Sequence, residues 1–445
     1  MATAQRPEAP VPHEEPRPRR PRAVFLAAAL AMAAGLAACT PAAPEPSGFQ
    51  VLAGDAERAD PSPEAARAAA RATNAFGTDL FSALPDDGNL AISPYSVAAA
   101  LAMTRAGAAG VTATEMDAVL HAAGLADLPA AFGSLDALLA GRAGEYRAVE
   151  DAEPLQLDLS FANAVWPQDG FEFEEQFLQT LARHYGAGVN IVDYLAETEA
   201  ARTAINEWVA EQTADRIPEL IPAGILTAAT RLVLTNTLYL NAPWLIPFET
   251  SQTADERFTL ADGATVDVPF MHQEESLAYA ADDAWQAVRM PYVGGELAMV
   301  VLLPEPGEFD IVASSLDSAA IDAISDALAP RDVRLALPKF EFRAPSGLNR
   351  ALIELGMPSA FSDEADFSAM SPMPLVISDV IHETFISVDE LGTEAAAATA
   401  VAIMETSAPT DVVDMTVDRP FLFWIVDEPT GALLFLGRVL DPSAS

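Results

Sequence analysis

Apolar residues recur at helical spacing in the first half of the chain and form strand-like runs in the second half. Within residues 63–84, Ala72, Ala75, Phe76 and Leu80 fall on one helical face. By the same criterion, helices are predicted over residues 96–106, 114–120, 173–185 and 200–212. Strands are predicted over residues 157–165, 231–240, 297–303, 333–342, 376–389 and 421–426. This order of elements predicts an α+β domain with large, mostly antiparallel sheets.

Two local signals add detail to this pattern. The run over residues 231–240 is almost continuously apolar, which predicts a strand buried on both faces. Thr112 is followed three residues later by Glu115, a spacing that predicts a capping box at the start of a helix. No linker rich in Pro, Gly or Ser follows residue 65, so a single domain is predicted over residues 66–445.

The N-terminal segment has the pattern of an export signal. Arg17, Arg19, Arg20 and Arg22 form a positive region before an apolar stretch over residues 23–36, which is too short to span a bilayer comfortably. The sequence LAAC at residues 36–39 resembles a bacterial lipobox, so residues 1–38 are predicted to be removed and Cys39 to carry lipid. Ordinary secretion after a small-residue cleavage site is the alternative. The Pro-rich residues that follow, within the predicted segment 39–65, would form a tether holding the domain at the cell envelope.

Charge and chemistry exclude several classes of function. The chain has 65 acidic and 24 basic residues and a formal charge of −41, which argues against binding nucleic acid or anionic lipid. Cys39 is the only cysteine, so an intramolecular disulfide cannot form. The histidines show no metal-ligand spacing, and the sequence has no nucleophile elbow, phosphate loop or dinucleotide fingerprint. An enzyme is therefore not expected, and neither a metal nor a cofactor is predicted. The histidines are His13, His121, His184, His272 and His382.

The segment over residues 390–401 is ambiguous in conformation. Its four consecutive alanines favour helix, Gly392 interrupts a helix, and the β-branched Thr393, Thr399 and Val401 favour strand. Its side chains are small enough to enter between two existing strands with little steric penalty. This combination is typical of a segment that changes conformation.

Motifs over most of the chain, from about residue 68 to 442, resemble those of the serpin family in content and order. The most specific are NLAISPYS at 89–96, GAAGVTATEM at 107–116, LVLTNTLYL at 232–240, LPKF at 337–340, DRPFLFWI at 418–425 and GALLFLGRV at 431–439. This resemblance implies the serpin fold, in which helices pack on large β-sheets and an exposed reactive-centre loop spans about residues 390–418.

The resemblance also implies roles for particular residues. Ser93, Ser96, Asn236 and His382 match a polar cluster, the shutter, beneath the centre of the main sheet, and Trp244 matches a tryptophan at the top of that sheet, the breach. The hinge of the loop would comprise Glu390, Gly392, Thr393, Glu394, Ala395, Ala396, Ala397, Ala398 and Thr399. Two positions depart from the family pattern. Glu383 stands where many members have lysine, and Leu391 stands where an acidic residue is usual.

Counting from Gly392 as the family does predicts the reactive bond between Thr406 and Ser407, with Met404 and Glu405 as neighbouring candidates. No basic residue lies nearby, so trypsin-like targets are disfavoured. Thr406 or Met404 would suit elastase-like, subtilisin-like or chymotrypsin-like proteases, and Glu405 would suit a Glu-specific protease.

The resemblance therefore implies a serine protease inhibitor that acts as a suicide substrate and requires no cofactor. The small hinge residues and the absence of proline among them favour inhibition. The alternatives are a non-inhibitory serpin, an inhibitor of cysteine proteases, and a surface lipoprotein that binds a ligand. Only Arg142 and Arg147 are basic within residues 125–150, so activation by heparin is not expected. A monomer is expected, with loop–sheet polymers as a possible failure mode.

Overall fold

The computed structural model describes residues 48–147, 153–394 and 412–444. The predicted signal segment, Cys39 and the loop residues Ala395–Thr399, Met404, Glu405, Thr406 and Ser407 lie outside the described residues. In the described part, no helix is long and apolar enough to cross a membrane.

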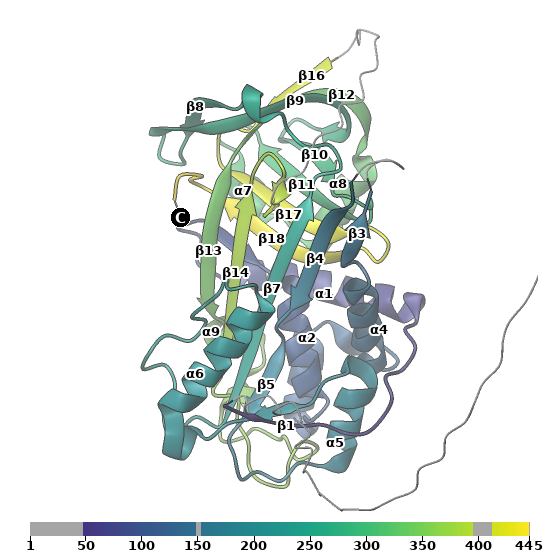
Figure 1. The fold of residues 1–445 in the computed structure, drawn as a ribbon, viewed down its shortest axis with the longest axis vertical. Coiled ribbons are helices and arrows are strands. Elements are labelled where there is room, and N and C mark those ends of the chain that lie inside the picture. Colours follow the sequence, from purple (N-terminus) through teal and green to yellow (C-terminus); the bar gives the residue numbers. More distant parts are fainter. Residues whose placement is uncertain (1–47, 148–152, 395–411, 445) are drawn as a thin grey trace, which may run out of the picture. The chain divides into compact units, whose positions relative to one another are not determined.

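The helices and short helical turns occur mainly in the first half of the chain (Figure 1). The α-helices are α1 (Pro63–Ala83), α2 (Pro94–Arg105), α3 (Gly110–Val119), α4 (Leu128–Ala140), α5 (Glu175–Thr180), α6 (Tyr194–Gln212), α7 (Phe309–Ser314), α8 (Ser318–Ala327) and α9 (Asn349–Leu355). The shorter turns are η1 (Ala122–Gly124), the π-helical η2 (Leu181–Tyr185), η3 (Thr250–Gln252) and η4 (Pro358–Phe361).

The strands form two large sheets and one small one. Their bounds are β1 (Gln50–Leu52), β2 (Leu90–Ile92), β3 (Gly144–Tyr146), β4 (Leu155–Phe161), β5 (Ala164–Pro167), β6 (Val189–Ile191), β7 (Leu232–Pro243), β8 (Ala254–Thr259), β9 (Thr265–Ala281), β10 (Trp285–Pro291), β11 (Leu297–Pro304), β12 (Ala329–Pro338), β13 (Phe340–Gly347), β14 (Asp379–Val388), β15 (Gly392–Thr393), β16 (Val412–Thr416), β17 (Phe421–Asp427) and β18 (Ala432–Val439).

The main sheet has the strand order β13-β14-β15-β7-β4-β3, with β5 also paired to β7. Figure 1 shows its long strands side by side, with α6 in front of their lower part. β14 and β7 are parallel neighbours from Asp379 opposite Val233 to Thr384 opposite Leu238. Beyond that point they separate, and β15 lies between them at Val388 and Ala242. The main sheet is therefore closed in its lower half and open toward the top.

The other large sheet has the order β16-β12-β9-β10-β11-β17-β18-β2, with β8 paired to β9. One apolar core joins this sheet, the helices α1 and α2, and one face of the main sheet. On the opposite face of the main sheet, α6 and the segment after it bury Trp166, Ile205 and Val233 in a separate apolar cluster. A strand can be inserted into the main sheet only between these two packed layers.

The predicted α+β class, with helices on large sheets, is confirmed. Two runs that were predicted as single strands are each two strands. Residues 157–165 are divided between β4 and β5, and residues 333–342 between β12 and β13. At Pro338 the chain leaves the second sheet, and from Phe340 it joins the main sheet. Apolar periodicity does not reveal such a change of partner strand, because both strands are buried.

The predicted capping box is wrong. α3 begins at Gly110, so Thr112 lies within the helix. Its hydroxyl accepts the N–H of Asp366, and the carboxylate of Glu115 accepts the N–H of Ser359. The folded unit also begins earlier than the predicted boundary at residue 66, because β1 pairs with β6.

Candidate functional site

The hinge is already one short strand inside the main sheet. Thr393 pairs with Ala242 on β7 and with Val388 on β14, and Gly392 pairs with Pro243. Just before it, residues 389–392 form a turn in which the N–H of Asp389 bonds the carbonyl of Gly392 at 3.0 Å. β15 is thus a two-residue strand, and the backbone turns away from the extended conformation at Glu394.

Gly392 is required by this close approach. A side-chain Cβ at this position would lie 2.2 Å from the carbonyl oxygen of Ala242 and 2.8 Å from the Cα of Pro243. Its φ of +156° also lies in a range that favours glycine. Any larger residue would push the hinge away from β7.

Trp244 anchors the turn that precedes the hinge. Its backbone N–H donates to the carbonyl of Leu391 at 2.8 Å, and its indole Nε1 donates to the carbonyl of Asp389 at 3.0 Å. Its ring stacks on Tyr292 with centroids 4.5 Å apart. The hydroxyl of Tyr292, in turn, lies 2.6 Å from that of Thr393. Trp244 and Tyr292 therefore hold the turn and the hinge in place through direct hydrogen bonds.

Glu390 fixes the other end of the turn. Its carboxylate accepts hydrogen bonds of 2.7 Å from Lys339 Nζ and of 2.7 Å from the Thr253 hydroxyl. Burial acts to raise its pKa, but the bonds from Lys339 and Thr253 outweigh burial and lower it. Glu390 is consequently charged and paired at neutral pH.

Glu394 follows the inserted pair and forms an ion pair with Arg216. Its side chain is only 7% exposed. Burial raises the pKa of Glu394 to about 7, with Arg216 acting to lower it and Glu341 adding to the rise. A carboxylate at the mouth of the open sheet therefore titrates near neutral pH.

His382 lies where β14 and β7 are still paired. Its Nε2 accepts the backbone N–H of Ser93 at 3.0 Å, so Nδ1 carries the proton and donates to the carbonyl of Asn236 at 2.8 Å. Burial lowers the pKa of His382 to about 4, and the bond to Asn236 only partly offsets this. The imidazole is thus neutral at pH 7 and bridges α2 to both central strands.

Ser93 and Ser96 complete this cluster from α2. The Ser93 hydroxyl accepts the N–H of Ser96 at 3.1 Å and caps the helix. The Ser96 hydroxyl bonds the carbonyl of Thr237 at 3.0 Å and also the amide oxygen of Asn163. Together these bonds tie α2 to the central strands at the point where they begin to separate.

These motifs and this sheet define a known family. Residues 71–442 match the family model described as "Serpin (serine protease inhibitor)". The chain belongs to the serpin family.

Characterised and uncharacterised relatives agree with this assignment. The leukocyte elastase inhibitor of Sus scrofa is 35% identical over 385 residues, covering 83% of this chain and 98% of that inhibitor. A serpin-like protein of Thermococcus kodakarensis is 39% identical over 376 residues, covering 83% of this chain and 85% of the relative. Among solved structures, the thermophilic serpin tengpin in its native state has a TM-score of 0.76 at 28% identity, covering 88% of this chain and 99% of tengpin.

The structure brings the four predicted shutter residues of this serpin together, with one difference. Asn236 joins the cluster through its backbone carbonyl, and its side-chain amide has no hydrogen-bond partner within the described part of the chain. Sequence reasoning missed Asn163, Tyr292 and Arg216. Asn163 and Arg216 carry no local signal because their partners are distant in the sequence, and the same holds for Tyr292 and Thr393.

The two departures from the serpin pattern are accommodated locally. Leu391 is half-buried, and its N–H donates to the Asp389 carboxylate at 2.8 Å. Glu383 is buried and lies 3.6 Å from the guanidinium of Arg343. Burial raises the pKa of Glu383, and Arg343 opposes that rise.

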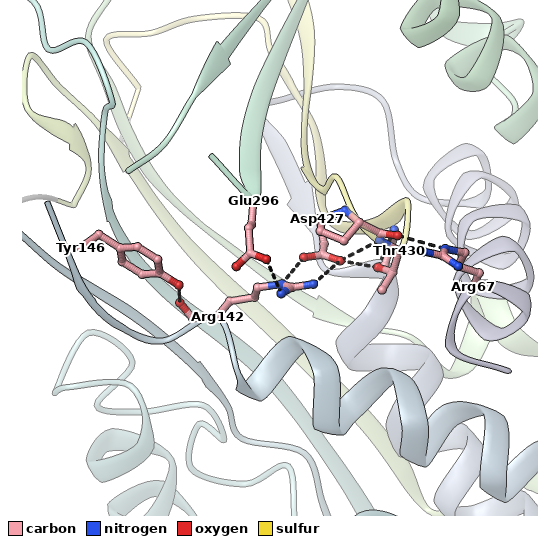
Figure 2. Close-up of polar contacts among 8 residues, drawn as sticks. Arg67, Arg142, Tyr146, Glu296, Asp427 and Thr430 are labelled. Atoms are coloured by element: carbon pink, nitrogen blue, oxygen red, sulfur yellow. Dashed lines mark hydrogen bonds and ion pairs between the residues drawn. The ribbon is translucent and has the colours of Figure 1, made fainter. Parts of the chain in front are cut away.

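A second buried polar cluster holds the edge of the main sheet (Figure 2). Arg142, in the connection from α4 to β3, donates to Asp427 at 2.6 Å and to Glu296 at 2.8 Å. Asp427 also accepts the N–H of Thr430 at 3.0 Å. Its carboxylate is fully buried, and Arg142 is paired with it inside the protein.

No group of three or more His, Cys, Asp or Glu side chains in the described ranges has an arrangement suited to a metal ion. What the site offers is mechanical. It presents a sheet that is open at one end, a hinge that has entered it, and a polar cluster at the point where the opening would spread.

Proposed function

We propose that this serpin is a suicide-substrate inhibitor of serine endopeptidases. The observation that carries the proposal is the pairing of Thr393 with both β7 and β14, the two walls of the open sheet. The hinge has thereby set the register in which the rest of the loop would enter. A loop that only served as a substrate would need no such register.

Extending that register gives a consistent inserted strand. Each step along the loop moves its partner one residue back along β7 and along β14, so Thr399 would face both Asn236 and His382. Thr393 is buried and faces Tyr292, and Ala395, Ala397 and Thr399 would share its face. All are small, so the core could accept them without repacking. The inserted Thr399 would break the His382–Asn236 hydrogen bond, and its hydroxyl could bond to His382 in place of the Asn236 carbonyl.

The length of the strands supports the predicted reactive bond. Leu232, the first residue of β7, would face Ile403, and Asp379, the first of β14, would face Ala402. Insertion would then end just before Met404, Glu405 and Thr406. A protease attached there would move from one end of the sheet to the other, roughly 35 Å at the usual rise of a strand.

The chemical step belongs to the protease. Its serine oxygen attacks the scissile carbonyl, an ester bond forms, and the peptide bond breaks; the serine proton passes to the leaving nitrogen, which becomes the amino terminus of the C-terminal fragment. The released hinge then enters the sheet, where its backbone N–H and C=O groups find partners on both sides. Insertion that outpaces hydrolysis of the ester traps the enzyme. The native state is consequently held kinetically, and cleavage releases it.

The target class follows from the loop sequence and from relatives. The loop has no basic residue between Gly392 and Asp414, which disfavours trypsin-like enzymes. Leukocyte elastase inhibitors are among the relatives at 35% identity. Elastase-, subtilisin- or chymotrypsin-like proteases are therefore the proposed targets.

The test mixes residues 40–445 with pancreatic elastase, chymotrypsin, subtilisin and a Glu-specific protease, followed by denaturing gels and mass spectrometry of the released peptide. A denaturation-resistant complex is expected, and the peptide mass identifies the bond cleaved. Thr399→Arg, whose side chain would enter the core, should abolish the complex and leave cleavage intact. Ala396→Arg is the matched control: in the same register it would lie on the other face, opposite the half-exposed Tyr239 and Phe385, and it should retain more of the complex. Cleavage by every enzyme with neither a complex nor a rise in melting temperature would refute inhibition and favour a non-inhibitory serpin.

The proposed location is the cell envelope, with lipid on Cys39. Labelling cells with a radioactive or clickable fatty acid should mark the wild-type chain and leave Cys39→Ser unlabelled. Equal labelling of both chains, or none of the wild type, would contradict the anchor and favour ordinary secretion.

A further inference from the structure

The inserted strand of the hinge stops at Glu394 for a reason visible in the backbone. Glu394 has a φ of +57°, which is left-handed and not extended. Its N–H still donates to the carbonyl of Ser387 on β14 at 2.9 Å. Full insertion would require Glu394 to become extended, because it would then continue the strand. Whatever holds Glu394 in its present conformation therefore holds the loop at one inserted pair.

Arg216 is the group in position to do this. It lies in the connection between α6 and β7, and its guanidinium pairs with the nearly buried Glu394 carboxylate. The same guanidinium lies 5.7 Å from the ring centroid of Phe385 on β14. Its backbone N–H is bonded to the carbonyl of Thr213 at 2.9 Å, which fixes the residue at the end of α6. Arg216 thus links three parts of the protein: the connection between α6 and β7, strand β14, and the hinge.

We propose that Arg216 is a positioning residue that, through Glu394, holds the hinge at one inserted pair and sets how readily the loop advances. The effect on trapping rests on the proposed inhibitory function, but the position of the hinge does not.

The energetic argument depends on the charge of Glu394. A buried carboxylate is costly without a counter-charge, and breaking a buried pair leaves that cost uncompensated. The other groups near Glu394 provide no replacement, since Glu341 on β13 repels it and Tyr239 on β7 is uncharged at neutral pH. Without Arg216, the ionised carboxylate is more stable in water, and its withdrawal takes Thr393 out of the sheet.

Arg343 provides a matched control. Its guanidinium lies 5.9 Å from the same Phe385 ring, and it pairs with Glu383, another buried carboxylate of β14. Both arginines are about half exposed, at 51% for Arg216 and 44% for Arg343. Arg343 pairs with β14 and not with the hinge, so it reports the general cost of removing an arginine from this face.

The test is hydrogen–deuterium exchange of the peptide containing residues 389–394 at pH 8. Arg216→Ala should accelerate its exchange at least ten-fold, and Arg216→Gln should act in the same direction, while Arg343→Ala leaves the peptide unchanged. Arg216→Ala combined with Glu394→Gln should restore protection, because a neutral side chain needs no counter-charge. Unchanged exchange in both Arg216 variants, or equal acceleration in Arg343→Ala, would overturn the proposal.

A second readout separates this proposal from the inhibitory function. With a protease that the wild type traps, Arg216→Ala should raise the moles of serpin consumed per mole of enzyme several-fold, and Arg343→Ala should not. If no protease is trapped by the wild type, the inhibitory function fails while the exchange result still decides the role of Arg216.

Discussion

The Nδ1–H of His382 donates a 2.8 Å hydrogen bond to the backbone carbonyl of Asn236, across the two strands that loop insertion would separate. The opposite ring nitrogen accepts the N–H of Ser93 at the start of α2. The neutral imidazole therefore joins three elements at the lower limit of the opening. The bond from Ser93 requires the uncharged ring, because a protonated Nε2 cannot accept a hydrogen bond, so protonation of His382 should weaken the junction.

His382→Gln should change how stability depends on pH. Because burial lowers the pKa of His382 to about 4, the unfolded chain binds a proton below pH 6.5 that the folded protein does not. The wild type should lose up to about 3 kcal/mol from this group as pH falls from 6.5 to 4. The variant lacks this loss, so its deficit relative to wild type should be largest at pH 7 and shrink toward pH 4. Urea unfolding at four pH values measures this, and a constant deficit would contradict it.

Gly392→Ala should expel the hinge from the sheet. A Cβ at residue 392 would lie 2.2 Å from the carbonyl oxygen of Ala242, which is backbone and cannot rotate away. Exchange of the amides in residues 389–394 should therefore rise at least ten-fold, while Gly263→Ala, at an open turn, leaves them unchanged. Protection equal to wild type in Gly392→Ala would show that the hinge tolerates a side chain.

Arg142→Ala should destabilise the whole domain. It leaves the fully buried Asp427 carboxylate without its cation, a change that typically costs about 3–5 kcal/mol. Arg350→Ala is the control, because Arg350 is 89% exposed and its solvent-screened pair with Glu354 should contribute little to stability. Melting temperature and urea midpoint compare the two variants. If Arg142→Ala loses no more stability than Arg350→Ala, the Arg142–Asp427 pair in Figure 2 has no structural role.

The position of the hinge should respond to pH near neutrality. Burial raises the pKa of Glu394 to about 7, while a withdrawn hinge would return it toward its usual 4.5. The inserted arrangement therefore binds a proton between those values that the withdrawn one does not, so insertion is favoured as pH falls from 7 and disfavoured above it. Exchange of residues 389–394 at pH 5.5 and 8, corrected for intrinsic rates, should show this for wild type. Glu394→Gln should show no pH dependence, and a flat wild-type response would contradict the prediction.

The sequence by itself determined the kinds of element and their order. Helical spacing around Phe76 and the apolar run of β7 depend only on neighbouring residues, and the structure has a helix and a doubly buried strand there. The small side chains of the hinge are likewise a local property. The ambiguity of this segment between helix and strand also follows from its residues, and a segment that changes conformation requires it.

The tertiary structure alone decided which groups meet. Arg216 and Glu394 are 178 residues apart, and Arg142 and Asp427 are 285 apart. No periodicity connects such positions, because their contact depends on where whole strands and connections are placed. The same limit explains why residues 333–342 were predicted as one strand, since a change of sheet at Pro338 leaves the apolar pattern unaltered. A hinge can be recognised from its composition, but the extent to which it has entered the sheet depends on Gly392, Trp244 and Arg216 being brought to one place.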